Sequence, residues 1–305
     1  MPNIKPAELY RKKMVRFESD YSGALLRAFM DARRLIIDII EANGVKISTI
    51  GLYKNVIRNL EVEAGQLKTE YKKYFDDIAS WYIKEQFELL KEAGEKDLPN
   101  VEAVKEKSFF ERQQIYDLYL DNTKIIDNFA YNLDVNFTKL SVSDVDTNDA
   151  LNRLMALDIK DGRASIFRLA KNAIITHVTT DSWTGSAAAT VAAVKVLNAQ
   201  RPKEYYKQAI AAIDHKTTDC CLRVHGQIQP LNKMFELIGT PRFADKISSP
   251  PFHWNCRTAQ ALYLPTMEEK GITTDEMRKA ASAELLARDM AGRSFINPSH
   301  ATSGR

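Results

Sequence analysis

The sequence predicts a mainly α-helical protein in which a long helical N-terminal region is followed by a small α+β domain. Apolar residues recur every three or four positions through most of the first 160 residues, as in helices that bury one face. Near Asp161 this pattern gives way to shorter apolar segments separated by Gly, Pro and Ser. The chain has 305 residues, which is long for one hydrophobic core, so two structural regions are expected.

The N-terminal region, residues 1–160, is expected to be a helical assembly region. A first helix is predicted over 7–43, where Asn43 and Gly44 form a stop signal. A second helix over 48–91 would extend about 60 Å, a length that suits a projecting hairpin or an assembly element. A break near Gly65 that folds the helix into an ordinary bundle is an equal alternative. Further helical zones are predicted over 102–140 and 143–157, and their many aromatic residues are expected mainly in the core.

The C-terminal part is expected to divide into a domain over 161–265 and a C-terminal helix with a flexible tail over 266–305. Within the domain, helices over 163–179 and 187–199 are predicted to be separated by the polar segment 180–186. Residues 205–214 fit either a helix or a buried strand. A loop-like segment should continue through Pro251, followed by a strand over 259–264 and a helix over 274–291.

Composition and charge narrow the class of protein. No apolar run approaches the roughly 20 residues needed to cross a bilayer, so no membrane partner is expected. The first residues contain no signal-type apolar segment, which favours synthesis and assembly in the cytoplasm. The net charge is +3, but ten basic residues against five acidic ones lie between Lys195 and Gln260. This excess fits either a solvated surface or contact with double-stranded DNA, with three lysines as the candidate contacts: Lys203, Lys207 and Lys246.

The most informative segment runs from Asp214 to Arg257, which holds all three cysteines and three of the five histidines. It contains two blocks separated by a variable loop. The first block carries Asp214, Thr218, Cys220, Cys221, His225, Gly226 and Gln227. The second block is the string Pro250, Pro251, Phe252, His253, Trp254, Asn255, Cys256 and Arg257. Because three is an odd number of cysteines, a disulfide framework is disfavoured, and thiols or metal ligands are expected instead.

These two blocks resemble the phage Mu F-like minor head protein family, the head morphogenesis proteins of tailed phages. The second block fits the family's Pro-Pro-x-His-x-Asn-Cys-Arg pattern in full. The first block departs from it at Thr218, where many members carry the first cysteine of a Cys-x-x-Cys pair. The resemblance covers about residues 163–265 and implies a Mu F-like domain there.

The resemblance implies a minor head protein that contacts the portal protein and the capsid or scaffolding subunits during assembly. It places the protein in the virion, in the head interior or at the portal vertex, with an influence on DNA packaging or ejection. No enzymatic activity is implied. Two alternatives stay open: a nucleic-acid-binding module inside the head and, third, a metal-dependent nuclease of the His-Asn-His type.

The spacing of cysteine and histidine allows a structural zinc site. Cys221 and His225 form one candidate pair of ligands, and His253 and Cys256 form the other. The alternative is that both cysteines are buried thiols and His253 is a hydrogen-bonded core histidine. Cys220 is expected to pack as a small apolar residue. Asn255 suits a turn, and Arg257 is expected to pair with Asp214 or Asp219.

Overall fold

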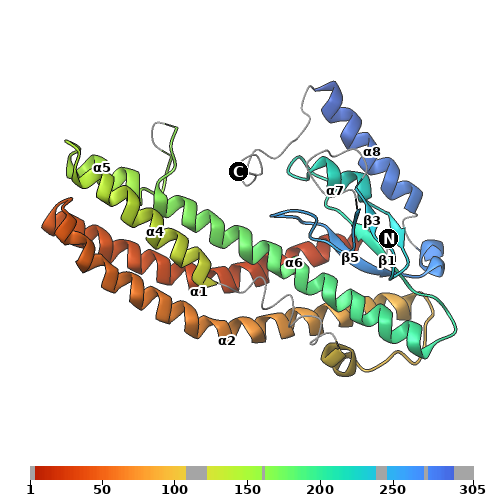
Figure 1. Cartoon of the computed structure of the whole chain (residues 1–305). Helices are drawn as coiled ribbons and strands as arrows, with labels where there is room; N and C mark the ends of the chain where they lie inside the picture. The colour runs from red at the N-terminus through yellow and green to blue at the C-terminus, as the bar shows by residue number, and fades with distance from the viewer. Residues whose placement is uncertain (1–3, 108–121, 160–161, 238–245, 271–273, 292–305) are drawn as a thin grey trace. The chain divides into compact units, whose positions relative to one another are not determined.

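The structure, a computed structural model, describes residues 4–107, 122–159, 162–237, 246–270 and 274–291, and it is mainly helical as predicted (Figure 1). Its helices are α1 (Ile4–Asn43), α2 (Ile47–Glu92), α4 (Asn122–Ser141), α5 (Thr147–Met155), α6 (Ile166–Gln200), α7 (Asp219–Val224), η1 (Pro265–Lys270) and α8 (Thr274–Met290). A further helical segment covers 101–107. Its strands are β1 (Tyr206–Ile210), β2 (Ile228–Gln229), β3 (Phe235–Glu236), β4 (Lys246–Ile247) and β5 (Ala259–Tyr263).

The chain forms two compact units, each built from separate stretches of sequence. The first unit contains Met1–Phe17, Phe75–Tyr116 and Thr179–Arg305, and the second contains Glu18–Tyr74 and Asp117–Val178. Helices α1, α2 and α6 therefore each contribute residues to both units. The motif blocks and all the strands belong to the first unit.

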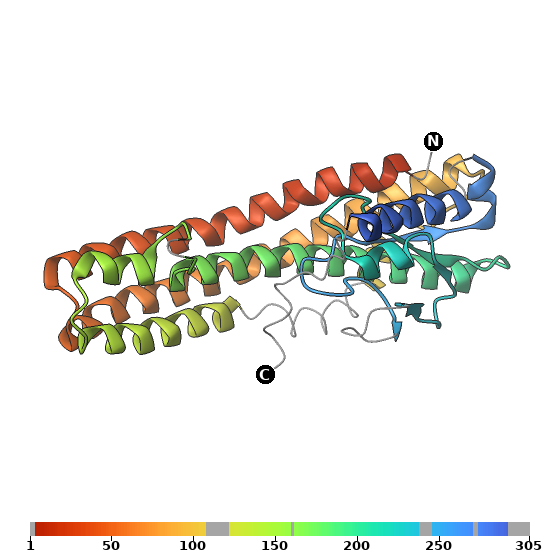
Figure 2. The ribbon, with the colours of Figure 1, turned by 90° about the horizontal axis from the view of Figure 1, so that it is seen from above.

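The second unit is a helical bundle with an aromatic core. Phe29 of α1, Phe129 of α4 and Phe167 of α6 contact one another, with ring centroids 5.5 to 6.2 Å apart. Tyr53 of α2 packs edge-on against Phe137 of α4. Figure 2 shows these helices running alongside one another. Aromatic residues at helical spacing thus fill the core here, as the sequence predicts.

Helix α2 is continuous, so the alternative of a break near Gly65 is wrong. A glycine in a helix interior is unfavourable by about 0.5–1 kcal/mol relative to alanine, which is too little to break a helix that buries one face. The predicted ends of the first two helices are confirmed. Gly44 and Gly94 follow α1 and α2 with φ of 71° and 93°, the left-handed conformation that terminates helices.

Helix α6 is also continuous, and the predicted interruption over 180–186 is wrong. Its polar side chains return hydrogen bonds to the helix: Thr184 Oγ1 donates to the carbonyl of Thr180, and Ser186 Oγ to that of Trp183. Gly185 allows close packing, because an added Cβ would lie 2.7 Å from Cδ1 of Phe75 in α2. Residues that favour turns in isolation are tolerated in this helix because another helix packs closely against them.

The main sheet of the first unit has strand order β2-β1-β5, and both pairings are antiparallel. Tyr206 pairs with Tyr263 and Ile210 with Ala259, which aligns β1 and β5 over their full lengths. The ambiguous segment 205–214 is therefore a strand in its first half, and the strand predicted over 259–264 is confirmed. The expected loop contains the short helix α7 and a second small sheet, β3-β4.

Side chains of α2 and α6 form hydrogen bonds with backbone amide and carbonyl groups of β5. Gln86 of α2 accepts a hydrogen bond from the amide of Leu262 (2.6 Å) and donates one to Thr190 Oγ1 (2.9 Å). Tyr82 of α2 and Thr190 of α6 both donate to the carbonyl of Gln260. The α2 segment from Phe75 onward therefore belongs structurally with the sheet, although the sequence places it in the helical N-terminal region.

Two further expectations concern chain ends and membranes. The helix predicted over 274–291 is confirmed as α8. The flexible tail predicted after this helix lies outside the described residues, as do the aromatic residues of 108–121. Among the described helices, none combines the length and the hydropathy that a bilayer crossing requires.

Candidate functional site

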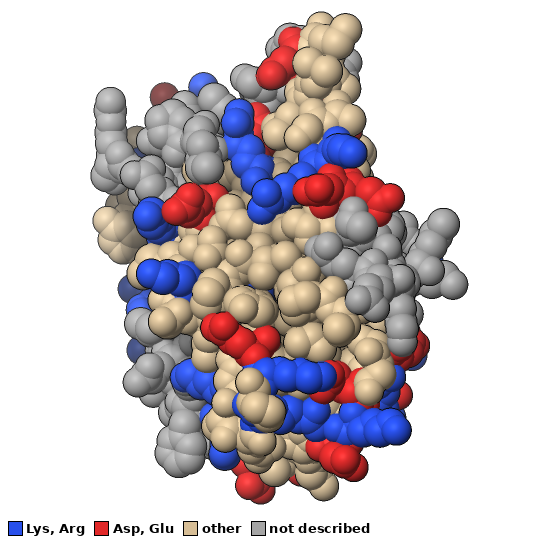
Figure 3. Space-filling model, turned by 90° about the vertical axis from the view of Figure 1, so that its right-hand side faces the viewer, with Lys and Arg blue, Asp and Glu red and all other residues tan. Residues whose placement is uncertain are grey.

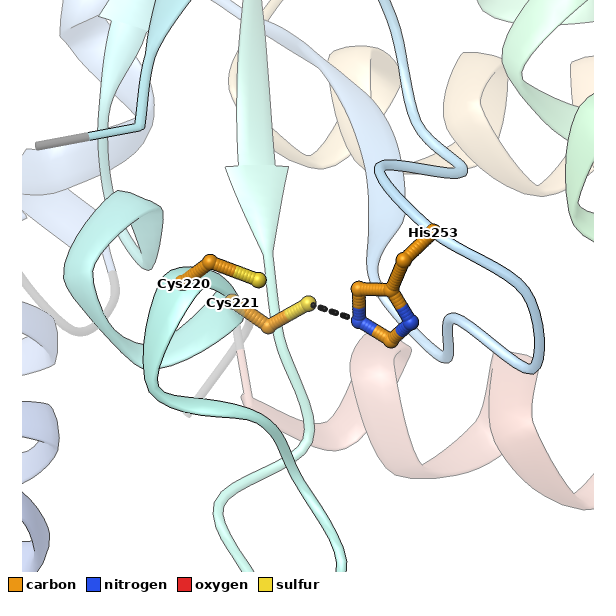
Figure 4. A group of neighbouring side chains, drawn as sticks. All are labelled: Cys220, Cys221 and His253. Atoms are coloured by element: carbon orange, nitrogen blue, oxygen red, sulfur yellow. Dashed lines mark hydrogen bonds between the residues drawn. The ribbon is translucent and has the colours of Figure 1, made fainter. Parts of the chain in front are cut away.

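The two motif blocks meet at the start of α7. This helix begins after Thr218, whose extended backbone (φ −72°, ψ 155°) places it at the N-cap position, and it carries Cys220 and Cys221 in its first turn. The second block approaches as a loop that contains a cis Pro250–Pro251 bond, and Asn255 turns the chain with φ of 59°. Figure 4 shows the two cysteine side chains pointing from α7 toward His253 on that loop.

The side chains at this junction form a tight cluster of potential metal ligands. Cys221 Sγ lies 3.1 Å from His253 Nε2 and 3.6 Å from Cys256 Sγ. The ligand atoms of Cys220, Cys221 and His253 all lie within 4.8 Å of one another. All three thiols are free and buried. Two thiolates of a tetrahedral zinc site would lie about 3.8 Å apart, given Zn–S bonds of about 2.3 Å, so the spacing fits zinc.

The orientation of His253 also fits a metal ligand. Its Nδ1 lies 2.7 Å from the carbonyl oxygen of Trp254, and because a carbonyl only accepts, Nδ1 carries a proton. Nε2 therefore faces Cys221 and the hydroxyl of Thr218, which is 2.8 Å away. Metal-bound histidines commonly donate their second ring nitrogen to a backbone carbonyl in this way, which fixes the ring.

Electrostatics in the metal-free cluster favour a thiolate next to an imidazolium. Burial by itself lowers the pKa of His253, but the neighbouring Cys220 and Cys256 raise that pKa to about 9. Burial raises the pKa of the Cys256 thiol, yet the hydrogen bond with Cys221 and the charge of His253 bring it down to about 5. A thiolate is the form of cysteine that binds a metal, whereas His253 would have to release the proton on Nε2 when a metal binds.

A bidentate ion pair holds the two blocks together beside the cluster. Arg257 Nη1 donates to Asp214 Oδ2 (2.8 Å), and Nη2 donates to Oδ1 (2.6 Å). Arg257 thereby holds the pKa of Asp214 below its usual range, and the amide of Lys216 and the hydroxyl of Thr217 act in the same direction. The predicted pairing of Arg257 with Asp214 is confirmed.

Arg288 of α8 is an important residue that the sequence reading missed. Its side chain is only 7% exposed, and it donates to the carbonyls of Thr217 and Asp214 and to the carboxylate of Asp219. A usable signal was present in the sequence, because Arg288 continues the buried stripe of Met277 and Ala281 at helical spacing. An arginine on such a stripe indicates a buried polar contact.

Gly226 is required where the first block ends. Its φ is 77°, and an added Cβ would lie 3.1 Å from Met277 Cβ and 3.2 Å from the carbonyl oxygen of Thr274. The amide of Gly226 donates to the carbonyl of Ala209 in β1. Glycine is therefore the residue that lets the chain turn from α7 into β2 while α8 packs closely on it.

His225 does not join the cluster, which corrects the predicted ligand set. Its Nδ1 accepts a hydrogen bond from the amide of Ala211 at 2.9 Å. Burial lowers its pKa to about 4, so the ring stays neutral and its proton lies on Nε2. Cys220, expected as a plain apolar residue, takes the place of His225 among the clustered groups. Residues four apart share a face of a helix, but α7 ends at Val224, and the extended backbone of His225 (φ −56°, ψ 126°) takes its side chain off the face that carries Cys221.

The three lysines proposed to contact DNA do not form a free basic surface. Lys207 is 1% exposed, donates to the carbonyl of Ser248 and lies over the ring of Phe235, so contact with DNA through Lys207 is excluded. Lys203 pairs with Glu95, and Lys246 pairs with Glu236. On the face drawn in Figure 3, basic and acidic side chains are interspersed.

Comparison of the chain with protein-family models, with curated proteins and with solved structures finds no match. The assignment of a function therefore rests on the motif residues and on their geometry.

Proposed function

We propose that this chain is a minor head protein of a tailed phage that acts in head morphogenesis through contacts with the portal protein and with capsid or scaffolding subunits. The observation that carries the proposal is the closure of the two motif blocks onto each other. Residues more than thirty positions apart, Cys221 and His253, lie in direct contact, and Asp214 binds Arg257 beside them. These are the residues on which the resemblance to the Mu F-like family depends.

A structural role for the junction agrees with its burial. Cys220, Cys221 and Cys256 belong to the hydrophobic core of the domain, together with Phe235 and Phe252. Ligands enclosed in a core leave no position for a substrate, in contrast to catalytic metal sites, which keep a coordination position open. The junction thus suits cross-linking of the loop that connects the blocks.

We propose further that zinc is the group bound at this junction, with Cys220, Cys221 and His253 as ligands and Cys256, next to Cys221, as the candidate fourth ligand. The zinc would cross-link α7 to the second block and contribute its binding free energy to folding. In small zinc-binding peptides that free energy is on the order of 10 kcal/mol.

The two alternative functions receive less support. A nuclease of the His-Asn-His type needs an acidic side chain available to a cation, whereas both carboxylate oxygens of Asp214 bind Arg257. A nucleic-acid-binding module needs cations directed at phosphates, whereas Lys207 is buried and Lys203 is paired. The assembly role requires neither feature.

Mass spectrometry of purified procapsids and virions, combined with crosslinking, tests the assembly proposal. Particles assembled from the genome that encodes this chain should contain it in few copies, crosslinked to portal subunits. An Arg257→Gln variant, in which the two blocks are released, should be incorporated less, while Arg34→Gln on the exposed surface of α1 should be incorporated normally. Absence of the chain from procapsids and virions alike would refute the assembly role.

Elemental analysis tests the zinc proposal independently of the assembly role. Protein purified without a metal-affinity tag should contain about one zinc per chain, and a strong chelator should lower its melting temperature sharply. A Cys256→Ser variant should lose the metal. Zinc-free protein whose melting temperature does not change on adding zinc would exclude the metal, leaving the alternative of buried thiols with a hydrogen-bonded histidine.

A further inference from the structure

A pocket beside α7 is lined by none of the residues of the cysteine cluster. Its volume is about 550 Å³, within the range of pockets that bind small molecules. Residues of α7, of β2 and of α8 line it, and so does Glu236 of β3. All of these elements belong to the first compact unit. Neither the motif residues of the second block nor the proposed assembly role accounts for this pocket.

The pocket carries more cationic charge than its surroundings neutralise. Arg223 of α7 and Arg278 of α8 both line it, and neither has an ion-pair or hydrogen-bond partner among the described residues. Its acidic residue, Glu236, already pairs with Lys246. Both guanidinium groups are therefore available to pair with an anion in the pocket.

His225 adds a donor that makes no hydrogen bond within the part of the chain that the structure describes. The residue is 5% exposed, yet it lines the pocket. Its Nδ1 accepts the amide of Ala211, which leaves the proton on Nε2, and no described residue provides an acceptor for that proton. This N–H group is therefore available to donate to an acceptor atom of a ligand in the pocket.

The polar lining is therefore rich in donors. Arginine has no acceptor atom, Nε2 of His225 is a donor in this tautomer, and Ser282 of α8 adds a hydroxyl. Leu222 and Leu285 supply apolar wall between these groups. This combination fits a ligand with an acceptor-rich anionic group attached to an apolar part.

We propose that this pocket binds a small ligand with an oxyanion group, a phosphate ester or a carboxylate, held by Arg223, Arg278 and Nε2 of His225. A guanidinium group matches both oxyanions with two parallel hydrogen bonds. A nucleic-acid duplex fits the site less well. His225 is buried, and the phosphate groups of a duplex would not reach its Nε2.

Calorimetric titration of the full chain with matched probes tests this proposal. Phenyl phosphate and benzoate share an apolar ring and differ in the oxyanion, and benzyl alcohol is the uncharged control. Neither anion is a strong zinc chelator, so binding can be measured without stripping metal from the cluster. We expect one of the two anions to bind with a Kd below about 1 mM, and benzyl alcohol not to bind.

Variants of the two arginines identify the site. Arg223→Gln and Arg278→Gln should each weaken binding of the anion about tenfold or more, since a hydrogen bond to a charged group contributes on that scale. Both arginines are exposed, so the variants should keep the wild-type melting temperature. Arg58→Gln removes an equally exposed arginine from α2 in the other unit and should leave binding unchanged.

Three outcomes would overturn the proposal. The first is that neither anion binds the wild-type chain in a saturable way. The second is that Arg223→Gln and Arg278→Gln bind as tightly as Arg58→Gln. The third is that a duplex oligonucleotide binds through both arginines while phenyl phosphate and benzoate do not, which would assign these side chains to nucleic acid instead.

Discussion

At the residue scale, the hydroxyl of Thr218 lies beside the zinc ligands that we propose. Thr218 stands three residues before Cys221, where many proteins of the Mu F-like pattern carry a cysteine. Its hydroxyl lies 2.8 Å from Nε2 of His253 and 3.1 Å from Sγ of Cys220. A hydroxyl is a weaker zinc ligand than a thiolate. Position 218 therefore suits a further zinc ligand, but threonine supplies a weak ligand atom there.

Replacing Thr218 with cysteine should therefore tighten zinc binding by at least about tenfold, because a thiolate would then lie next to His253. Competition with a chromophoric chelator measures the change in Kd. Thr138→Cys is the matched control, since it adds a thiol on the exposed surface of α4 and should leave the affinity unchanged. Equal zinc affinity of Thr218→Cys and wild type would show that residue 218 does not face the metal.

Asp214 and Arg257 link the blocks through charge, and their side chains are only about a quarter exposed. The pKa of Asp214 is depressed below its usual 3.8 by Arg257. A carboxyl group with a depressed folded-state pKa adds stability that is present above the unfolded-state pKa and is lost as the pH falls toward the folded-state value. The ion pair should thus stabilise the domain in full above about pH 5.

The Asp214→Asn variant should lose about 2 kcal/mol of unfolding free energy at pH 7. This loss lies between those typical of exposed and of fully buried ion pairs. Below pH 4 the difference from wild type should shrink, because Asp214 then takes up a proton in the unfolded chain while the folded chain still holds it ionised. Urea unfolding at a series of pH values measures this. Asp31→Asn, which removes an exposed partner of Arg34, should show little loss at any pH. A constant difference between pH 7 and pH 2 would contradict the assignment.

At the scale of elements, α2 and α6 show how packing overrides local preference. Both contain glycine in the helix interior, but the two glycines have different surroundings. Gly185 of α6 lies against the ring of Phe75, whereas nothing lies within 4 Å of a Cβ added at Gly65 of α2. The first glycine is needed for helix packing, and the second has no steric requirement.

Substitution by alanine should consequently have opposite effects at the two positions. Gly185→Ala should destabilise the protein by about 1–3 kcal/mol through overpacking against Phe75. Gly65→Ala should stabilise it by about 0.5–1 kcal/mol, because alanine favours the helix and meets no clash. Thermal and urea unfolding of the two variants measure both signs. Stabilisation by Gly185→Ala would mean that α2 and α6 are not packed closely at this point.

At the scale of the whole molecule, the first compact unit depends on residues from the N-terminal half. Gln86 binds the amide of Leu262 in β5, and Tyr82 binds the carbonyl of Gln260. Glu95 is 8% exposed and binds Arg201, Lys203 and Tyr205. A C-terminal domain that starts near Asp161, as the sequence predicts, would fold without the N-terminal half, but these contacts give a reason to expect otherwise.

A fragment of residues 161–305 should therefore unfold without a cooperative transition, because β5 and Tyr205 lose their buried partners. A fragment of 75–305 should recover a cooperative transition, since it restores Gln86 and Glu95. Circular dichroism during heating compares the two. Cooperative melting of 161–305 at the temperature of the full chain would show that the α2 contacts are dispensable and would support the autonomous domain.

The sequence by itself determined the local and chemical features of this protein. Helical periodicity predicts α1, α2, α4 and α8 because each buries one face, and glycine marks the ends of α1 and α2 because left-handed backbone favours it. The sequence also predicts that Arg257 pairs with Asp214 or Asp219, because an arginine and a carboxylate form a strong bidentate contact when the two blocks meet, and the structure shows the pair with Asp214.

Only the tertiary structure decided features that depend on distant neighbours. Local preference predicts a break at 180–186, yet α6 continues because Phe75 packs on Gly185. The spacing of cysteine and histidine suggests that His225 is a metal ligand, yet its Nδ1 accepts a hydrogen bond from the amide of Ala211 instead. The excess of basic residues suggests that Lys207 contacts DNA, yet Lys207 lies in β1 with its side chain buried. In each case a contact with a residue remote in sequence outweighs a preference of the local chain, and such contacts leave no periodic signal.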